Sequence, residues 1–357
     1  MTENKIITAE KQNRIIANWL FIGVGMLLVQ VLLGGITRLT GSGLSITEWN
    51  PLMGALPPLN EEDWQAAFLK YQQIAQFKYL NHEFELSDFK FIFFWEWFHR
   101  QWARFMGLVF LFPFIYFWVK GYFKKWMILP LVMLFVLGGM QGLIGWIMVK
   151  SGLNDEDLYV NHFRLAIHFM AAMVLIGYTL IFALSLVIPK EQRVQNTPLR
   201  KFAVAITALL LVQLVYGCFM AGLKAANAAP TWPSINSELI PATLFKNGFL
   251  ESVLHNPITI HFVHRTLAYL IFILIIIWWA KARKQLSSAA FNKAKKWPLI
   301  LVMSQVVLGI VTVVSSTTIV FGKFGVFEWL AELHQLTGML LLLSLLAAIY
   351  ILKPTGR

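Results

Sequence analysis

Charged residues are scarce in this chain of 357 residues. Asp, Glu, Lys and Arg make up 13% of it, whereas hydrophobic residues make up 58% and the mean hydropathy is +0.64. A soluble domain carries about 25% charged residues, so too little polar surface is available here to cover a water-soluble globule. The composition therefore excludes a soluble globular protein and predicts one that is embedded in a membrane.

Cysteine is nearly absent, and the amino-terminal segment does not have the features of a leader. Cys218 is the single cysteine and lies in an apolar run, so an intramolecular disulfide is excluded. The first 18 residues are polar with mixed charge. They lack the apolar core and cleavage site of a signal peptide and the Arg-rich, acid-poor character of a transit peptide. We therefore expect a multi-pass protein of a bacterial cytoplasmic (inner) membrane.

Long apolar runs are abundant. A transmembrane helix needs about 20 consecutive, mostly apolar residues, and eight runs are long enough. They lie near residues 19–37, 97–119, 126–149, 165–188, 202–222, 258–280, 297–320 and 330–352. The sequence thus predicts an all-α integral membrane protein with eight transmembrane helices.

The basic residues gather in alternate connecting segments. If the amino terminus lies inside, the short inner segments carry 18 Lys and Arg residues, against 9 in the much longer outer segments. The outer segments also carry most of the acidic residues. This distribution follows the positive-inside rule and predicts an N-in/C-in topology. The net charge of +12 therefore sets the topology and does not indicate a nucleic-acid partner.

A two-helix unit recurs four times along the chain. Each odd-numbered span has a glutamine four residues before a glycine, and each even-numbered span has a histidine near its outer end. The members are Gln30–Gly34, Gln141–Gly145, Gln213–Gly217 and Gln305–Gly309, with His99, His168, His264 and His334. We interpret the repeat as two pseudo-symmetric four-helix bundles. Residues 1–195 form the first, with a long outer loop at 38–90, and residues 196–357 form the second.

The four matching histidines are the strongest functional signal. An ionisable side chain within a membrane helix is costly and is a functional candidate by default, although one histidine alone could be a packing contact. Zinc needs three or four ligands grouped together, which two separate pairs fit poorly. Two facing imidazoles suit the iron of a heme. We pair His99 with His168 and His264 with His334, which predicts two heme sites.

The residues beside these histidines differ between the halves. Arg100 and Arg265 each follow a histidine, and either bind heme propionates or extend to the membrane interface. Glu96 lies three residues before His99 on the same helix face, whereas its counterpart is His261. An acid beside one heme only would move protons or position a reacting group; the alternative is a surface glutamate in an aromatic belt. The Gln-x3-Gly repeats are either interhelical contacts or heme-pocket lining.

Several long motifs, in order along the chain, resemble those of the heme A synthases. They are Gly34-Gly35-Ile36-Thr37-Arg38-Leu39-Thr40-Gly41-Ser42-Gly43-Leu44-Ser45, Trp49-Asn50-Pro51, Pro57-Pro58, Glu96-Trp97-Phe98-His99-Arg100, Ala226-Asn227 before Thr231-Trp232-Pro233, His261-Phe262-Val263-His264-Arg265, and His334-Gln335-Leu336-Thr337-Gly338. The resemblance spans about residues 19–352, and the long first loop is similar to the branch that includes mitochondrial members. Another branch carries a cysteine pair in its outer loops, which this sequence lacks, so no thiol-based step is transferred.

The resemblance implies an oxidoreductase that makes heme A for terminal oxidases. Its substrate would be heme O, whose C8 methyl group is hydroxylated twice and then loses water to leave a formyl group. It further implies that His99 and His168 bind the substrate heme beside the catalytic Glu96. His264 and His334 would be the axial ligands of a retained heme b that passes electrons.

The resemblance leaves four questions about partners and chemistry open. They are the electron donor, the source of oxygen, docking to heme O synthase and homo-oligomerisation. Two other classes of function also fit paired histidines in a membrane. One is a bis-histidine cytochrome b-type electron carrier. The other is a heme exporter or chaperone, although the Trp-Trp-Asp type of heme-handling loop is absent from the sequence.

Overall fold

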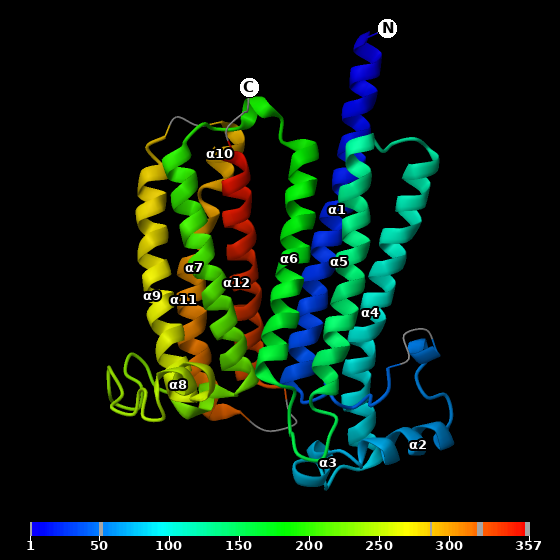
Figure 1. Cartoon of the computed structure of the whole chain (residues 1–357), viewed down its shortest axis with the longest axis vertical. Helices are drawn as coiled ribbons and strands as arrows, with labels where there is room; N and C mark the ends of the chain where they lie inside the picture. The colour runs from blue at the N-terminus through cyan, green and yellow to red at the C-terminus, as the bar shows by residue number, and fades with distance from the viewer. Residues whose placement is uncertain (1, 50–52, 286–287, 320–323, 354–357) are drawn as a thin grey trace.

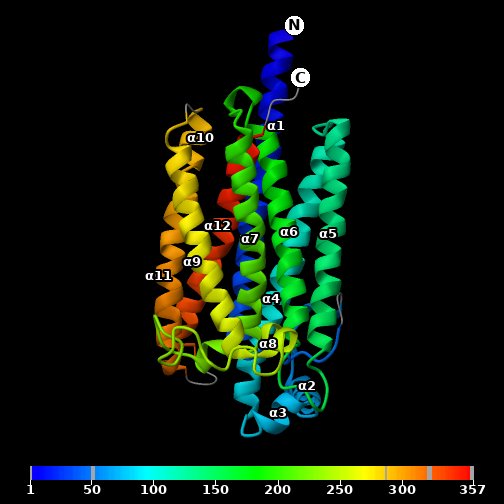
Figure 2. The ribbon, with the colours of Figure 1, turned by 60° about the vertical axis from the view of Figure 1, so that its left-hand side comes forward.

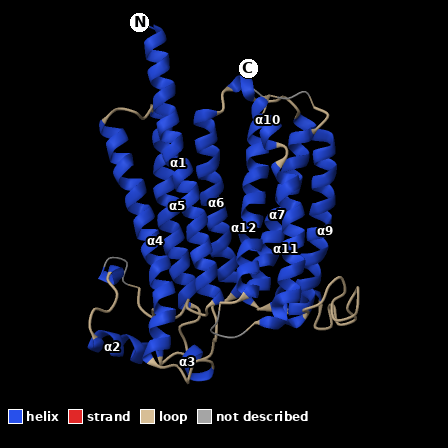
Figure 3. Ribbon diagram, turned by 180° about the vertical axis from the view of Figure 1, so that it is seen from behind, coloured by secondary structure: helices blue, strands red, loops and turns tan. Residues whose placement is uncertain are grey.

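Eight long helices stand side by side and form the body of the protein (Figure 1). The computed structural model describes residues 2–49, 53–285, 288–319 and 324–353. The long helices are α1 (Thr2–Leu39), α4 (Leu86–Val119), α5 (Lys125–Lys150), α6 (His162–Val187), α7 (Thr197–Gly222), α9 (Pro257–Ala282), α11 (Trp297–Ser315) and α12 (Val326–Ile351). Each is long and apolar enough to cross a membrane. Within the described ranges the chain forms only helices and loops (Figure 3), so the all-α prediction is confirmed.

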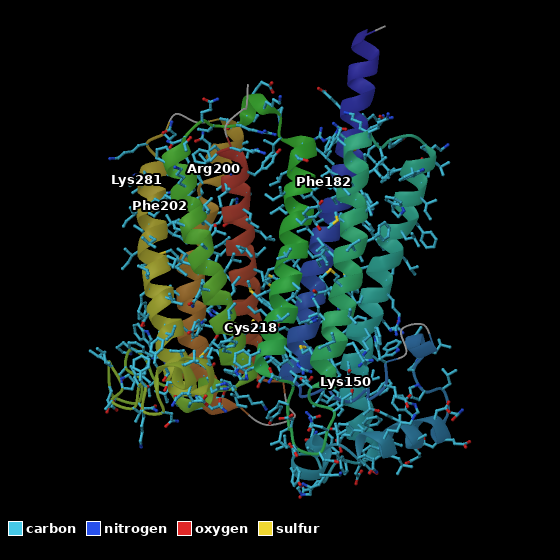
Figure 4. The ribbon with its side chains drawn as sticks, in the orientation of Figure 1. Lys150, Phe182, Arg200, Phe202, Cys218 and Lys281 are labelled. Carbon is cyan, nitrogen blue, oxygen red and sulfur yellow. The ribbon has the colours of Figure 1, made fainter. Side chains whose placement is uncertain are left out.

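The short elements lie at the two ends of this bundle. α2 (Glu61–Tyr71), α3 (Ala75–Tyr79) and α8 (Phe249–His255) lie at one end, here called the loop end (Figures 1 and 2). At the other end, here called the basic end, α1 begins, α12 ends and α10 (Ala289–Ala294) lies. Arg200 and Lys281 lie near the basic end, and Cys218 lies near the loop end (Figure 4). Short 3-10 turns complete the chain at Met53–Ala55, Lys190–Gln192, Ala225–Ala228 and Ser316–Thr318.

Two spans differ from their predicted bounds. α1 begins at Thr2 and not near residue 19, so it projects well beyond the other helices at the basic end (Figure 1). α11 ends at Ser315 and is followed by a 3-10 turn to Thr318, whereas its predicted end at residue 320 lies outside the described residues. The helical spacing of apolar residues marks the membrane-spanning part of a helix and does not mark a polar extension beyond it.

The two groups of four helices pack differently. α7, α9, α11 and α12 form a closed ring in which each helix packs against two neighbours. α4 packs on α1, α1 on α6 and α6 on α5, but α4 and α5, both described throughout, make no extended backbone contact. α1 and α6 join this open group to α7 and α12. The division at residues 195 and 196, and the pseudo-symmetry, stay predictions.

The main hydrophobic core lies inside the closed ring and along its junction with α6. Ile206, Trp278, Met339 and Leu345 are fully buried members of it. The indole of Trp278 donates a hydrogen bond to the carbonyl of Leu199 at 3.2 Å. Helices in lipid associate chiefly through close packing and interhelical hydrogen bonds, so this core fixes where the four helices of the ring stand.

Helix caps fix the starts of two helices at the loop end. The side chain of Asn60 accepts the backbone N–H of Asp63 at 2.8 Å and so caps α2. The carboxylate of Asp88 accepts the backbone N–H of Glu85 at 3.0 Å, and α4 then continues without a break into its membrane span. The long outer loop is therefore attached to an extension of α4.

Aromatic side chains hold α2 against that extension. The rings of Phe68 and Tyr71 lie 5.1 and 5.4 Å from the ring of Phe89, and all three side chains are buried. Burial raises the pKa of Tyr71, whose hydroxyl accepts a hydrogen bond from Asn81 at 2.6 Å. α2 thus has its apolar face on the extension of α4.

The topology is tested with one lysine from each end of the bundle. Lys124 and Lys246 are both exposed and lie in connecting segments at the basic and loop ends. In cells, a membrane-impermeant maleimide added from the periplasmic side should label Lys246→Cys and not Lys124→Cys, because the positive-inside rule places the basic end in the cytoplasm. Cys218 is buried and should give little background. Labelling of Lys124→Cys alone would show that the basic end faces the periplasm, so the predicted topology would be wrong.

Candidate functional site

The four predicted histidines line one cavity. Its volume is about 1350 Å³, and His99, His168, His264 and His334 all contribute to its wall. Pockets for drug-sized ligands occupy about 300–1,000 Å³, so this one has room for more than one such ligand. The sequence predicts two separate sites, whereas the structure joins both histidine pairs in one continuous space between the two groups of helices.

The glutamine of each repeat lies against the histidine of the next long helix. Four amide contacts share this arrangement: Gln30 Nε2 to the His99 carbonyl at 3.2 Å, Gln141 Nε2 to the His168 carbonyl at 2.9 Å, Gln213 Nε2 to the His264 carbonyl at 3.0 Å, and Gln305 Nε2 to the His334 Nε2 at 3.3 Å. All four glutamines also line the cavity. The interpretation of the glutamine repeat as an interhelical contact is therefore confirmed, and each amide is also part of the cavity wall. That this cavity is a heme pocket stays a prediction.

The glycine of each repeat makes room for the imidazole. A Cβ atom added at Gly34 would lie 3.2 Å from the His99 ring, and one added at Gly145 would lie 2.8 Å from the His168 ring. The corresponding distances in the other group are 3.5 Å for Gly217 to His264 and 2.9 Å for Gly309 to His334. A small residue thus allows each ring to lie against a helix backbone. We call each set of glutamine, glycine and histidine a histidine clamp.

The spacing of His264 and His334 fits a shared metal ion. Their ring centres lie 6.4 Å apart and their planes are inclined by 68°. An imidazole nitrogen binds a metal at about 2 Å and lies about 1 Å from its ring centre, so two rings on opposite sides of one ion have centres about 6 Å apart. The Nδ1 atoms of both rings are buried without a hydrogen-bond partner, which is costly unless a ligand is bound. These two residues fit the axial ligands of a heme.

Glu96 is buried and bound on both carboxylate oxygens. Only 3% of it is exposed. Its Oε2 accepts hydrogen bonds from the Ser45 hydroxyl and the Ile46 backbone N–H, both at 2.8 Å, and its Oε1 pairs with Arg100 Nη2 at 2.5 Å. The interpretation of Glu96 as a surface residue of an aromatic belt is therefore wrong. The carboxylate lies in the cavity wall and joins α4 to the segment after α1.

His261, at the matching position of the other group, has a different environment. It is 2% exposed, lines the cavity, and has no hydrogen-bond partner on either ring nitrogen among the residues that the structure describes. The two cavity ends therefore differ in chemistry: a carboxylate bound by three donors lies near His99, and an imidazole with no such partner lies near His264. The sequence predicts this difference in residue type but not the difference in hydrogen bonding.

Arg100 and Arg265 fasten the segments that follow α1 and α7. Arg100 donates to the carbonyl oxygens of Ile46 and Glu48, both at 3.1 Å. Arg265 donates to three carbonyl oxygens, those of Ser234, Ala229 and Thr231, at 3.1, 3.2 and 2.7 Å. Their role in both groups is therefore to hold a loop over the cavity, which neither sequence interpretation includes. Contact with heme propionates stays a prediction for both residues.

Two further cations line the junction of the two groups, and sequence reasoning assigned neither a role. Arg38 of α1 donates to the carbonyl of Ala221 on α7 at 3.1 Å. The ammonium of Lys224 lies 3.7 Å from the ring centre of Tyr159, and burial, followed by the charge of Arg38, lowers the pKa of Lys224 to about 8. Both residues lie in the cavity wall and would favour an anionic group there. Arg38 stands in a recognised motif, whereas no motif marks Lys224.

Replacing one clamp glutamine should change the histidine that it contacts. In Gln213→Leu the His264 ring loses an amide at 3.3 Å and its carbonyl loses a donor at 3.0 Å. Outer-sphere contacts of this kind change metal affinity by about 10- to 100-fold, so we expect lower heme occupancy and shifted low-spin electron paramagnetic resonance signals.

The control variant is Gln335→Leu. Gln335 also lines the cavity, but its amide donates to the carbonyl of Val31 at 3.4 Å and not to a histidine. It should keep the wild-type spectrum. Equal spectra in the two variants would show that the clamp does not position the histidine.

Comparison with known proteins identifies the family. The family model described as cytochrome oxidase assembly protein matches residues 17–346. A protein named heme A synthase from Flavobacterium johnsoniae is 37% identical over 88% of this chain and 93% of its own length. Proteins of the same name from Rhodospirillum centenum and Parvibaculum lavamentivorans are 40% and 39% identical, over 95% and 93% of this chain and 88% and 97% of their own lengths.

These similarities cover nearly the whole chain, including all four histidine clamps. The eight spans and the bacterial relatives agree with the predicted localisation, and the protein is a multi-pass protein of the bacterial cytoplasmic membrane. The chain belongs to the cytochrome oxidase assembly protein family.

Proposed function

We propose that this protein is a heme A synthase. It binds heme O between His99 and His168 and converts the C8 methyl group of heme O into the formyl group of heme A. The observation that carries the proposal is one cavity with two clamped histidine pairs whose matching neighbours differ, since Glu96 lies three residues before His99 and His261 lies three residues before His264. Glu328 also lines the cavity, six residues before His334, but it has no counterpart role in the clamp. The names of the relatives support the identity of the product.

The reaction is an oxidation at one carbon atom. Two successive hydroxylations give a geminal diol, which loses water to leave the aldehyde, so the carbon loses four electrons overall. Heme b bound by His264 and His334 would supply a one-electron redox centre. The pairing of these histidines in a separate closed ring of helices supports a retained cofactor there, since the ring holds both ligands rigidly.

The substrate is assigned to the other histidine pair because of Glu96. A carboxylate within a helical turn of His99 can accept a proton from the reacting group or hold that group in place. Its pairing with Arg100 at 2.5 Å and its hydrogen bonds from Ser45 and Ile46 fix its position in the cavity wall. His261 offers no carboxylate at the matching place, which supports divided roles for the two ends.

A cytochrome b-type electron carrier is the main alternative. Such a protein would hold two permanent hemes, neither of them changed chemically. The unequal neighbours of the two histidine pairs favour an enzyme. Chromatography of the hemes extracted from the purified protein separates the two proposals, because heme O or heme A beside heme B is expected of the enzyme alone.

Loss of one axial histidine should empty one site selectively. In His264→Ala the iron loses a ligand, so we expect strong depletion of heme B, measured by pyridine hemochrome spectra. In the matched variant His168→Ala, heme B should stay near the wild-type level while heme O and heme A are lost. Loss of heme B in His168→Ala instead of His264→Ala would show that the roles of the two sites are exchanged. A wild-type level of heme B in His264→Ala would show that His264 is not an axial ligand of this heme.

Removal of the Glu96 charge should stop product formation without emptying the cofactor site. In Glu96→Gln we expect at least about a 100-fold loss of heme A, the usual scale for a positioned acid or base, with heme B unchanged. Chromatography would show accumulated heme O or its hydroxylated form. Glu61→Gln, at an exposed pair with Lys90, is the control. Wild-type heme A in Glu96→Gln would remove Glu96 from the mechanism.

A further inference from the structure

The cavity extends deeper in the open group of helices than in the closed ring. The clamp gives every helix a reference point, which is its clamp glycine or its clamp histidine. In the open group the deepest lining residues lie 11 to 15 residues from that point, whereas in the closed ring each lies 7 residues from it. They are Trp19, Phe110, Leu134 and Thr179 in the open group, and Leu210, Ile271, Val302 and Leu341 in the ring. At about 1.5 Å per residue, the open side reaches at least about 16 Å and the closed side about 10 Å.

Large side chains fill, in the closed ring, the places that glycines leave empty in the open group. When the repeats are aligned on their clamps, Gly23 corresponds to Ile206, Gly107 to Phe272 and Gly138 to Val302. Ile206 and Val302 are 0% and 2% exposed, and Phe272 packs against the same core. The two groups therefore share the clamp arrangement, and at these three positions the closed ring has large side chains where the open group has glycine.

The glycines of the open group do not serve helix packing. Glycine weakens a helix relative to alanine, and membrane helices usually carry it where two backbones approach closely. A Cβ atom added at Gly23, Gly107, Gly138 or Gly142 would meet no atom within 4 Å. α4 and α5, which carry three of these glycines, make no extended backbone contact. The glycines thus keep space open instead of closing it.

We propose that this deeper space binds the isoprenoid chain of the substrate heme. We call it the inner channel, lined by Trp19, Gly23, Gly107, Phe110, Gly138 and Thr179. The inference rests on the proposed function, in which heme O is the substrate at His99 and His168. Heme O carries a long isoprenoid chain and heme B does not, which matches a deep space below one histidine pair and a filled core below the other.

The chemistry of the channel wall suits an apolar chain. The hydroxyl of Thr179 already donates to the Leu175 carbonyl at 2.7 Å, and the other named residues present apolar side chains, an indole or glycine backbone within helices. Among the described lining residues, Arg104 is the deepest charged one, five residues beyond His99, and the wall beyond it is apolar or glycine apart from Thr179. Burial of an apolar chain there is therefore favourable. The clamp then sets the macrocycle at the level of the histidines, and the chain fixes how the macrocycle is turned in its plane.

The open side between α4 and α5 also gives the chain a route from the bilayer. Gly107 on α4 and Gly138 and Gly142 on α5 are exposed, and both helices lie at the lipid-facing edge of the bundle (Figures 1 and 2). Beyond these glycines the two helices meet through the rings of Phe110 and Phe135, whose centres lie 4.6 Å apart. A substrate dissolved in the membrane can therefore enter sideways at the level of the glycines, between the histidines and this ring contact.

Filling the inner channel with the residues of the closed ring tests the proposal. The variants are Gly23→Ile, Gly107→Phe and Gly138→Val, with Gly107→Ala as a milder step in case the larger changes prevent folding. Heme b content reports folding. Heme O and heme B are titrated separately into protein from cells without heme O synthase, and the Soret band follows binding at the His99–His168 site. Gly25→Ile is the matched control, because Gly25 is also unhindered but does not line the cavity.

We expect the filled variants to bind heme O at least about tenfold more weakly, since several chain methylenes lose their burial, while heme B binds as in wild type. Gly25→Ile should bind both hemes normally. Unchanged heme O affinity in the filled variants would overturn the channel proposal. If these variants also lost a bound membrane lipid, the channel would be a lipid site and not a site for the isoprenoid chain. A wild-type protein that neither binds heme O nor forms heme A would instead overturn the proposed function.

Discussion

The structure depends on the need to satisfy polar groups inside a membrane. An imidazole in the hydrocarbon region has no water to bind, and an unpaired buried polar group is costly. Each histidine clamp meets this need in part, because the amide nitrogen of one helix reaches the histidine of the next while a glycine lets the ring lie against the backbone. Among the described residues, the Oε1 atom of each clamp glutamine and the Nδ1 atoms of His264 and His334 find no partner, which favours a bound ligand at these places. The same contact ties the helices together in pairs: α1 with α4, α5 with α6, α7 with α9, and α11 with α12.

Both groups of helices contain the clamp, but the space beyond it is packed in the closed ring and open in the other group. The closed ring has a packed core around Ile206 and Val302, which holds His264 and His334 at a fixed spacing of 6.4 Å. A rigid surrounding suits a permanently bound redox group. The open group has unhindered glycines and a pair of helices, α4 and α5, without extended backbone contact, which suits a large ligand that must enter and leave. Packing density therefore distinguishes the proposed cofactor side from the proposed substrate side.

The loop end encloses the cavity through hydrogen bonds to backbone carbonyls. Arg100 and Arg265 hold the segments after α1 and α7, and Glu96 binds the same first segment through Ser45 and Ile46. The acid proposed to act in the reaction is thus also part of the cover of the site. The position of the carboxylate therefore depends on the position of that segment.

The sequence by itself determined the membrane class, the eight spans, the four histidines and the glutamine and glycine repeats. These are local patterns of hydropathy and spacing, and helix geometry turns them directly into faces and depths. Only the tertiary structure decided that Glu96 is buried, that Arg100 and Arg265 bind loop carbonyls, and that both histidine pairs share one cavity. It also decided that α4 and α5 meet through aromatic rings such as Phe110 and Phe135 and not through their glycines, although these small residues could equally have packed together. These features depend on distances between segments far apart in the chain, and such distances follow from the packing of whole helices and not from the order of the residues within any one of them.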